Sequence, residues 1–118
     1  MYGVPADVSF AFFEGRRLDA VLYGRHQLSL LFDGEVSLNI EGDVGVVAAG
    51  AGEVVVTDSR EVARPILDLL SLIVAAVRVD PPTSLILVFD DGTEVRAIDD
   101  RGPYECFNVH HGQSLWIM

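Results

Sequence analysis

Hydrophobic and polar residues alternate along two stretches of the chain that predict β-hairpins. In the later stretch, residues 84–98, a three-residue loop Asp90-Asp91-Gly92 brings the alternating apolar residues to one face, as a half-buried antiparallel pair requires. The third loop position needs a positive φ, which suits glycine. The apolar face of this predicted hairpin consists of Leu85, Leu87, Phe89, Val95 and Ala97.

The earlier stretch, residues 28–40, has the same alternation. With the loop Phe32-Asp33-Gly34, the predicted opposed pairs are Leu30/Val36, Ser29/Ser37 and Leu28/Leu38. The later hairpin then has two extra residues at its tip, an even number that leaves each side chain on its face. We interpret the two stretches as an internal repeat covering about residues 15–48 and 69–109.

Other short apolar runs, separated by Gly and Asp, predict further strands over residues 8–13, 18–23, 44–48, 53–57, 72–79, 104–109 and 114–117. Asp58-Ser59-Arg60-Glu61 has the form of a capping box, and Pro65 suits a first helical turn. We therefore predict one short helix from about Pro65 to Leu70 or a little beyond, with room for one turn before it.

These elements predict an α+β fold, a mainly antiparallel sheet made of two β-meander repeats with one short bridging helix. The 118 residues form one predicted domain, residues 1–118, which is long enough to bury a core without disulfides. Ile86 and Val88 are apolar and lie opposite the predicted core face. We expect the helix or another subunit to cover them.

The charge and the basic residues of the chain argue against several classes of function. Eighteen acidic residues against eight basic ones give a formal charge of −10, and every basic residue is arginine. Nucleic-acid binding is disfavoured because phosphate contacts need clustered cations, and lysine chemistry is excluded. The longest apolar run, residues 66–79, is too short for a membrane span and contains Asp68 and Arg78. Because no export signal is visible either, we expect a cytoplasmic protein without membrane contact.

Candidate catalytic and metal-binding residues are few. The single cysteine, Cys106, excludes an internal disulfide and is typical of a small buried hydrophobe. His110 and His111 are adjacent on a predicted strand, so their side chains point to opposite faces and are unsuited to one metal ion. Gly50-Ala51-Gly52 lacks the third glycine and the following helix of a phosphate-binding loop. We expect neither a metal nor a cofactor.

The C-terminal segment contains the candidates for partner binding, Tyr104, Glu105 and Trp116. Exposed tyrosine and tryptophan dominate the binding energy of many interfaces. The alternative is that these rings complete the core, where large aromatics are usually buried.

The pattern of a strand, an LxLxF-like strand, a DG turn, a second strand and a Tyr-Glu-aromatic motif resembles a family of small bacterial domains of unknown function, of the high-GC Gram-positive type. The matching residues are Leu85-Ile86-Leu87-Val88-Phe89-Asp90-Asp91-Gly92, Val95, and Tyr104-Glu105-Cys106-Phe107. The family often has tryptophan at the position of Phe107. The resemblance implies no catalytic residues. Some similar small acidic domains act as immunity proteins, which is an analogy only.

Three functional hypotheses follow. The favoured one is a non-enzymatic binding protein, immunity-like, whose acidic surface binds a basic protein partner. The second is a small-ligand-binding or hydrolytic domain that uses Glu105, His110 or Cys106. The third is a structural homodimer that covers the face of Ile86 and Val88.

Overall fold

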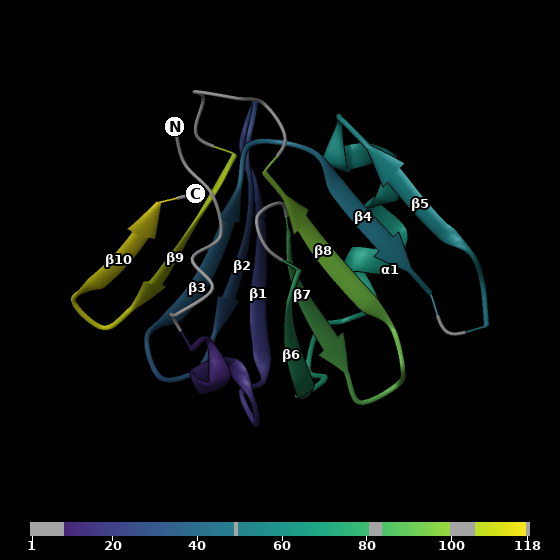
Figure 1. Cartoon of the computed structure of the whole chain (residues 1–118). Helices are drawn as coiled ribbons and strands as arrows, with labels where there is room; N and C mark the ends of the chain where they lie inside the picture. Colours follow the sequence, from purple (N-terminus) through teal and green to yellow (C-terminus); the bar gives the residue numbers. More distant parts are fainter. Residues whose placement is uncertain (1–8, 49, 81–83, 100–105, 118) are drawn as a thin grey trace.

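The computed structural model describes residues 9–48, 50–80, 84–99 and 106–117, and these form ten strands, two 3-10 turns and one short helix (Figure 1). In chain order the elements are η1 (Ala11–Phe13), β1 (Leu18–Tyr23), β2 (Leu28–Phe32), β3 (Val36–Ile40), β4 (Val44–Val47), β5 (Glu53–Val56), η2 (Ser59–Val62), α1 (Ala63–Leu67), β6 (Val74–Asp80), β7 (Ser84–Phe89), β8 (Glu94–Ile98), β9 (Phe107–His111) and β10 (Ser114–Ile117).

The fold is mainly β, so the predicted α+β class is wrong. The strands form two antiparallel five-stranded sheets, in the orders β1-β2-β3-β9-β10 and β5-β4-β8-β7-β6. The helix α1 begins two residues and ends three residues before its predicted bounds. Residues 68–70 form turns, Ser71 has a φ of 75°, and the β-branched residues that follow favour β6. None of the helices in the described residues is long and apolar enough to cross a membrane.

The predicted β-meanders are also wrong, because the two halves of the chain exchange strands. The chain leaves β3 for the other sheet, where β4 pairs with β8. It later leaves β8 for the first sheet, where β9 pairs with β3. Each sheet therefore contains three strands from one half and a two-stranded hairpin from the other.

The same arrangement occurs twice around the bridge between Arg17 and Ile73, which joins the start of β1 to the start of β6. On one side of the bridge the Leu18 N–H donates to the Leu72 carbonyl at 3.0 Å, and on the other the Val74 N–H donates to the Arg16 carbonyl at 2.9 Å. Both β1 and β6 have an irregularity after their first residue. Elements of the first half of the chain thus occupy positions that match those of the second half. That the two halves arose as a sequence repeat stays a prediction.

The register of the second hairpin is as predicted, with Leu87 opposite Val95. The first hairpin is shifted by two residues from its prediction, so that Phe32 pairs with Val36 around the loop 33–35. Gly34 has a φ of 74° and Glu35 a φ of 60°, so the left-handed third position is occupied by glutamate. A register shift of two residues leaves each side chain on its predicted face of the sheet. The two hairpins have loops of equal length, so the predicted two extra residues at the tip of the later hairpin are wrong.

At the N-terminus, the strand predicted over residues 8–13 is instead the 3-10 turn η1; residue 8 lies outside the described residues. The Phe13 N–H donates to the Phe10 carbonyl at 3.1 Å, and both rings are buried. Three-residue spacing brings the two rings to the same side of a 3-10 turn, where they enter the core together.

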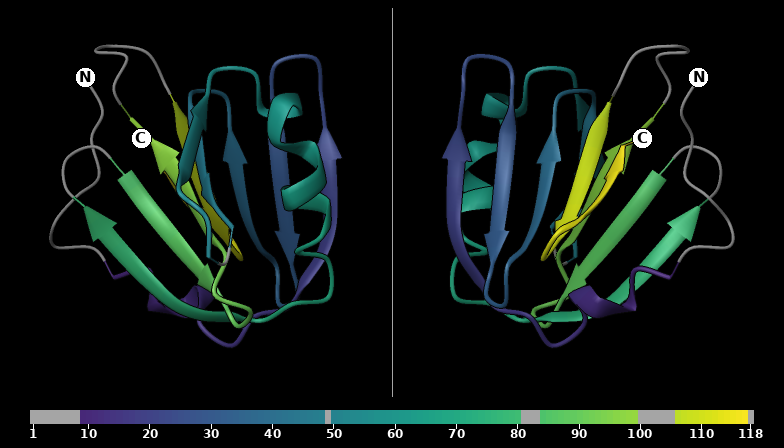
Figure 2. Two further views of the ribbon diagram at one scale, coloured as in Figure 1. Left: turned by 90° about the vertical axis from the view of Figure 1, so that its right-hand side faces the viewer. Right: turned by 90° about the vertical axis from the view of Figure 1, so that its left-hand side faces the viewer.

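The core lies between the inner faces of the two sheets, and η2 and α1 close one side of it (Figure 2). Val62, Ile66 and Leu69 are the buried residues of this helical segment. The central strands contribute alternate residues, so that Leu28 and Leu30 face Leu85 and Leu87 within one cluster.

Candidate functional site

Of the three predicted partner-binding residues, the structure describes Trp116. Tyr104 and Glu105 lie outside the described residues. Trp116 is half-buried and belongs to an aromatic cluster, with its ring 5.5 Å from that of Phe12 and 5.7 Å from that of Phe10. Its position against the core favours a packing role, and its role in partner binding stays a prediction.

The residues considered for catalysis do not come together as a nucleophile and base. Cys106 is completely buried, so its thiol is inaccessible to a substrate. His110 pairs with Ser37 on the outer face of β9, whereas the His111 ring stacks on Phe12 with their centroids 4.3 Å apart. Among the described residues, no group of three His, Cys, Asp or Glu side chains could hold a metal ion.

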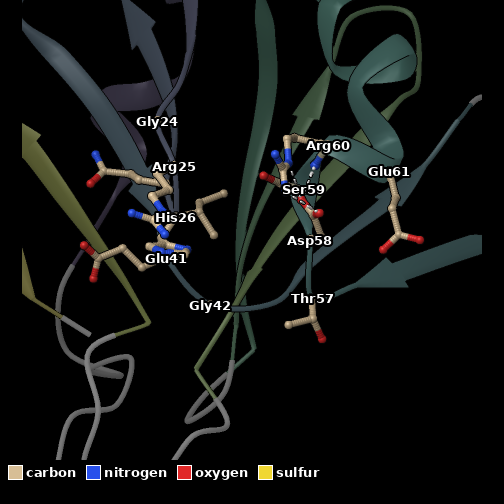
Figure 3. A pocket seen from close by; sticks show the side chains of 12 residues that line it. Gly24, Arg25, His26, Glu41, Gly42, Thr57, Asp58, Ser59, Arg60 and Glu61 are labelled. Carbon is tan, nitrogen blue, oxygen red and sulfur yellow. Dashed lines mark hydrogen bonds and ion pairs between the residues drawn. The ribbon is translucent and has the colours of Figure 1, made fainter.

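A cleft of about 460 Å³ lies where three connections meet, and the sequence patterns did not indicate it (Figure 3). The connections are the β1–β2 loop, the β3–β4 link and the segment that joins β5 to η2. A hydrogen bond of 2.7 Å from the Gly24 N–H to the Gln27 carbonyl closes the first loop. The polar side chains of the cleft include those of Arg25, His26, Glu41, Asp58, Arg60 and Glu61.

Asp58 organises one wall of this cleft. One of its oxygens, Oδ1, accepts a hydrogen bond of 3.1 Å from the Arg60 backbone N–H, as an N-cap residue does. The same carboxylate binds the Arg60 guanidinium at 3.0 Å and 2.9 Å. The hydrogen bond from the Arg60 side chain, followed by that from its backbone, lowers the pKa of Asp58 below its ordinary value. The charges of Asp58 and Arg60 are therefore paired with each other, and Glu61 adds a further carboxylate to this wall.

Tyr23 connects this wall to the first sheet. Its hydroxyl donates a hydrogen bond of 3.3 Å to the Ser59 carbonyl, so β1 and η2 are held together. Partial burial, with a smaller effect of the Asp58 charge, raises the pKa of the Tyr23 hydroxyl. The cleft is thus a polar recess with fixed walls. It is suited to binding a polar group rather than to nucleophilic chemistry.

Strand β5, which leads into the cleft, is the last strand of the second sheet among the described residues. It pairs with β4 on one side, and the order of the sheet ends there. Val54 and Val55 point to opposite faces of the strand and are 52% and 51% exposed. An edge strand with exposed β-branched residues offers unpaired backbone groups to another strand. This edge is the candidate site for a protein partner.

The outer face of the second sheet is crossed by ion pairs. Two of its rows of outward residues run across β6, β7, β8, β4 and β5. The first row consists of Arg78, Ile86, Arg96, Gly45 and Val55, and the second of Ala76, Val88, Glu94, Val47 and Glu53. Arg78 binds Glu94 at 2.6 Å, and Arg96 binds Glu53 at 3.1 Å. Ile86, which lies between the two arginines in the register, is only 3% exposed. Long arginine side chains shield apolar neighbours, so Arg78 and Arg96 are suited to cover part of this face. The predicted cover by a helix or second subunit stays a prediction.

The matching face of the first sheet is here called the uncharged face. Read across β1, β2, β3, β9 and β10, its first row is Leu22, Ser29, Asn39, Asn108 and Ile117. Its second row is Ala20, Leu31, Ser37, His110 and Leu115. Neither row contains an acidic residue or an arginine, in a chain with a formal charge of −10. These uncharged residues stand at alternate positions of each strand in the sequence. Only the order of the strands shows that they share one face.

The two-sheet architecture, in which all the described strands pair antiparallel, defines a β-class domain of a kind that supports many functions. A family model described as a family of unknown function, DUF6188, matches residues 11–111, and the chain belongs to this family. The predicted membership of a family of unknown function is confirmed at this level, whereas its Gram-positive type and motif stay predictions. Neither the curated proteins nor the solved structures contain a match to this chain.

Proposed function

We propose that this protein is a non-enzymatic binding module that pairs the edge of β5 with an extended, basic segment of a protein partner. The observation that carries the proposal is the edge of β5, which has no second strand beside it in the part of the chain that the structure describes and where Val54 and Val55 are both about half exposed on opposite faces. Backbone hydrogen bonds to such an edge give affinity, and pockets for alternate side chains give selectivity.

The charge of the chain defines the partner. A formal charge of −10 attracts a basic segment and speeds its encounter with the edge. Glu53 begins β5, and Asp58 and Glu61 follow it, although Arg96 and Arg60 pair with the first two. The attraction therefore comes from the whole chain more than from one residue, and binding should weaken as salt is added.

The test is a titration of the isotope-labelled full chain with a peptide of about six residues, the length of an ordinary strand, in which arginine and valine alternate. Amide signals of residues 53–56 should shift most, because these groups acquire new hydrogen-bond partners. A peptide with glutamate in place of arginine should bind more weakly. A central proline, which removes a backbone donor, should also weaken binding.

A matched pair of variants locates the binding site. Val55→Lys places a like charge on the edge and should weaken binding of the arginine peptide about tenfold, which corresponds to about 1.4 kcal/mol. Ile117→Lys changes the matching position in β10 and should leave the affinity unaltered. Equal weakening by both variants, or amide shifts confined to other strands, would contradict a site on β5.

A further inference from the structure

We propose that the cleft between the β1–β2 loop and η2 binds a small zwitterion of the basic amino acid class, such as lysine. The carboxylate of the ligand binds Arg25 on one wall, and its side-chain cation binds Glu61 on the other (Figure 3). The cleft volume of about 460 Å³ lies within the range of small-molecule sites, which is about 300–1,000 Å³. This site is separate from the β5 edge and independent of the proposed function.

Arg25 differs from the other six arginines of the described residues. Each of those six binds a carboxylate or a backbone carbonyl; they are Arg16, Arg17, Arg60, Arg64, Arg78 and Arg96. Arg25 has no such partner in the part of the chain that the structure describes, although the sequence contains 18 acidic residues. A guanidinium presents its N–H donors in a planar fork that fits a carboxylate. The donors of Arg25 are therefore available to a ligand.

Glu61 supplies an unpaired negative charge on the opposite wall. Its backbone N–H donates to the Asp58 carbonyl at 3.0 Å, whereas none of the ion pairs among the described residues includes its carboxylate. Of the other carboxylates of the cleft, Asp58 is bound to Arg60, and Glu41 has an interaction of its own. A ligand with opposite charges at its two ends therefore pairs both Arg25 and Glu61.

The two walls of the cleft are held in place before a ligand arrives. The hydroxyl of Tyr23, the residue before the β1–β2 loop, donates to the Ser59 carbonyl of the other wall at 3.3 Å. The loop itself is closed by the hydrogen bond of 2.7 Å from the Gly24 N–H to the Gln27 carbonyl. Walls that are already ordered lower the entropic cost of binding. They also favour a linear ligand whose length matches their separation.

The net charge of the cleft favours a zwitterion that is positive overall. Three carboxylates and two guanidiniums line the cleft, so its formal charge is −1 with its histidine neutral. The whole chain has a formal charge of −10, which repels a simple anion and attracts a cation. A diamine complements this charge but leaves Arg25 without a partner. A basic amino acid has one carboxylate and two cationic groups, so it meets both conditions.

A titration of the isotope-labelled full chain with L-lysine tests the site. Amide signals of residues 24–27 and 57–61 should shift most, because these segments line the cleft. Two related molecules test the two ends of the ligand: cadaverine, which lacks the carboxylate, and hexanoate, which lacks both amines. Each should bind about tenfold more weakly than L-lysine, because each leaves a charge of the cleft unpaired. Cadaverine that binds as tightly as L-lysine, or an absence of shifts in both segments at millimolar L-lysine, would overturn the proposal.

Two substitutions assign the charges to their residues, with circular dichroism to confirm that each variant is folded. Arg25→Gln should weaken binding of L-lysine about tenfold without weakening binding of cadaverine, which has no carboxylate. Glu61→Gln should weaken binding of both, because both have the cation. The control Arg64→Gln changes an arginine of α1 that lies outside the cleft and is 87% exposed, and it should bind L-lysine as the wild type does. Equal weakening of both ligands by Arg25→Gln, or a loss of L-lysine binding in the control, would likewise overturn the assignment.

Discussion

The outer faces of the two sheets occupy matching positions in the fold but differ in chemistry. On the second sheet, Arg78 and Arg96 form ion pairs with Glu94 and Glu53, and Ile86, which lies between the two arginines in the register, is buried. On the first sheet, the same positions are occupied by aliphatic, hydroxyl and amide side chains. The comparison shows that the architecture leaves the outward residues free to vary, so function is to be sought where the matching halves differ.

The largest expected effect concerns the inner faces, where the two sheets are alike. Leu30 and Leu87 are completely buried, and each lies in the middle of its own hairpin. Leu30→Ala and Leu87→Ala should each lower the free energy of unfolding by about 2–5 kcal/mol, through lost burial and the cavity left behind. Urea denaturation measures both losses. Values that differ by more than about 2 kcal/mol would show that the matching positions are not energetically alike.

The alternation that defines these inner faces is also what made much of the fold predictable. Local pattern sufficed for most strands and for the register of the second hairpin, because successive side chains alternate between faces. The exchange of β4 and β9 between sheets could not be predicted, since it depends on contacts between distant residues. Pro65 and Asp58 correctly indicated a helical segment, but one helix of five residues beside the ten described strands makes a mainly β fold rather than an α+β fold.

The candidate sites were harder to predict than the fold. The cleft brings Arg25, Glu41 and Asp58 together from three connections that are far apart in the sequence. The uncharged face likewise combines strands from both halves, so only the strand order reveals it. Trp116 was conspicuous by residue type alone, and residue type cannot distinguish a ring packed on Phe12 from a ring that binds a partner.

A smaller effect on the free energy of unfolding is expected from Arg96, on the ion-paired outer face of the second sheet. Arg96 lies 3.1 Å from Glu53 and 3.4 Å from Asp80, and it also donates to Ser84 Oγ at 3.1 Å. Arg96→Ala should lower the free energy of unfolding by about 1–2 kcal/mol, because paired charges are lost and Ile86 loses its cover. Urea denaturation is again the measurement.

Arg96→Met separates the two contributions, because methionine restores part of the cover without the charge. The methionine variant should therefore lie between the wild type and the alanine variant. Its remaining deficit should shrink at about 1 M salt, where exposed ion pairs are screened. A methionine variant as unstable as Arg96→Ala would show that the ion pairs, rather than the arginine side chain as a cover, stabilise this face.

The smallest expected effect on stability comes from the ion pair between Asp58 and Arg60 in the cleft. This exposed pair is a reference for the ion pairs on the outer face of the second sheet. The side chains are 45% and 67% exposed, and the folded state lowers the pKa of Asp58. A lowered carboxyl pKa contributes stability that is present above the unfolded pKa, and this contribution is lost as the pH falls through the folded pKa.

Asp58→Asn keeps an oxygen to cap η2 but removes the charge. The wild type should therefore be slightly more stable than Asp58→Asn at pH 6. The difference should begin to shrink near the ordinary aspartate pKa of 3.8 and disappear once the pH is below the lowered pKa of the folded state. Thermal unfolding at a series of pH values measures this. A difference that persists undiminished in acid would mean that the hydrogen bond to the cap, rather than the ion pair, connects Asp58 to the stability of the fold.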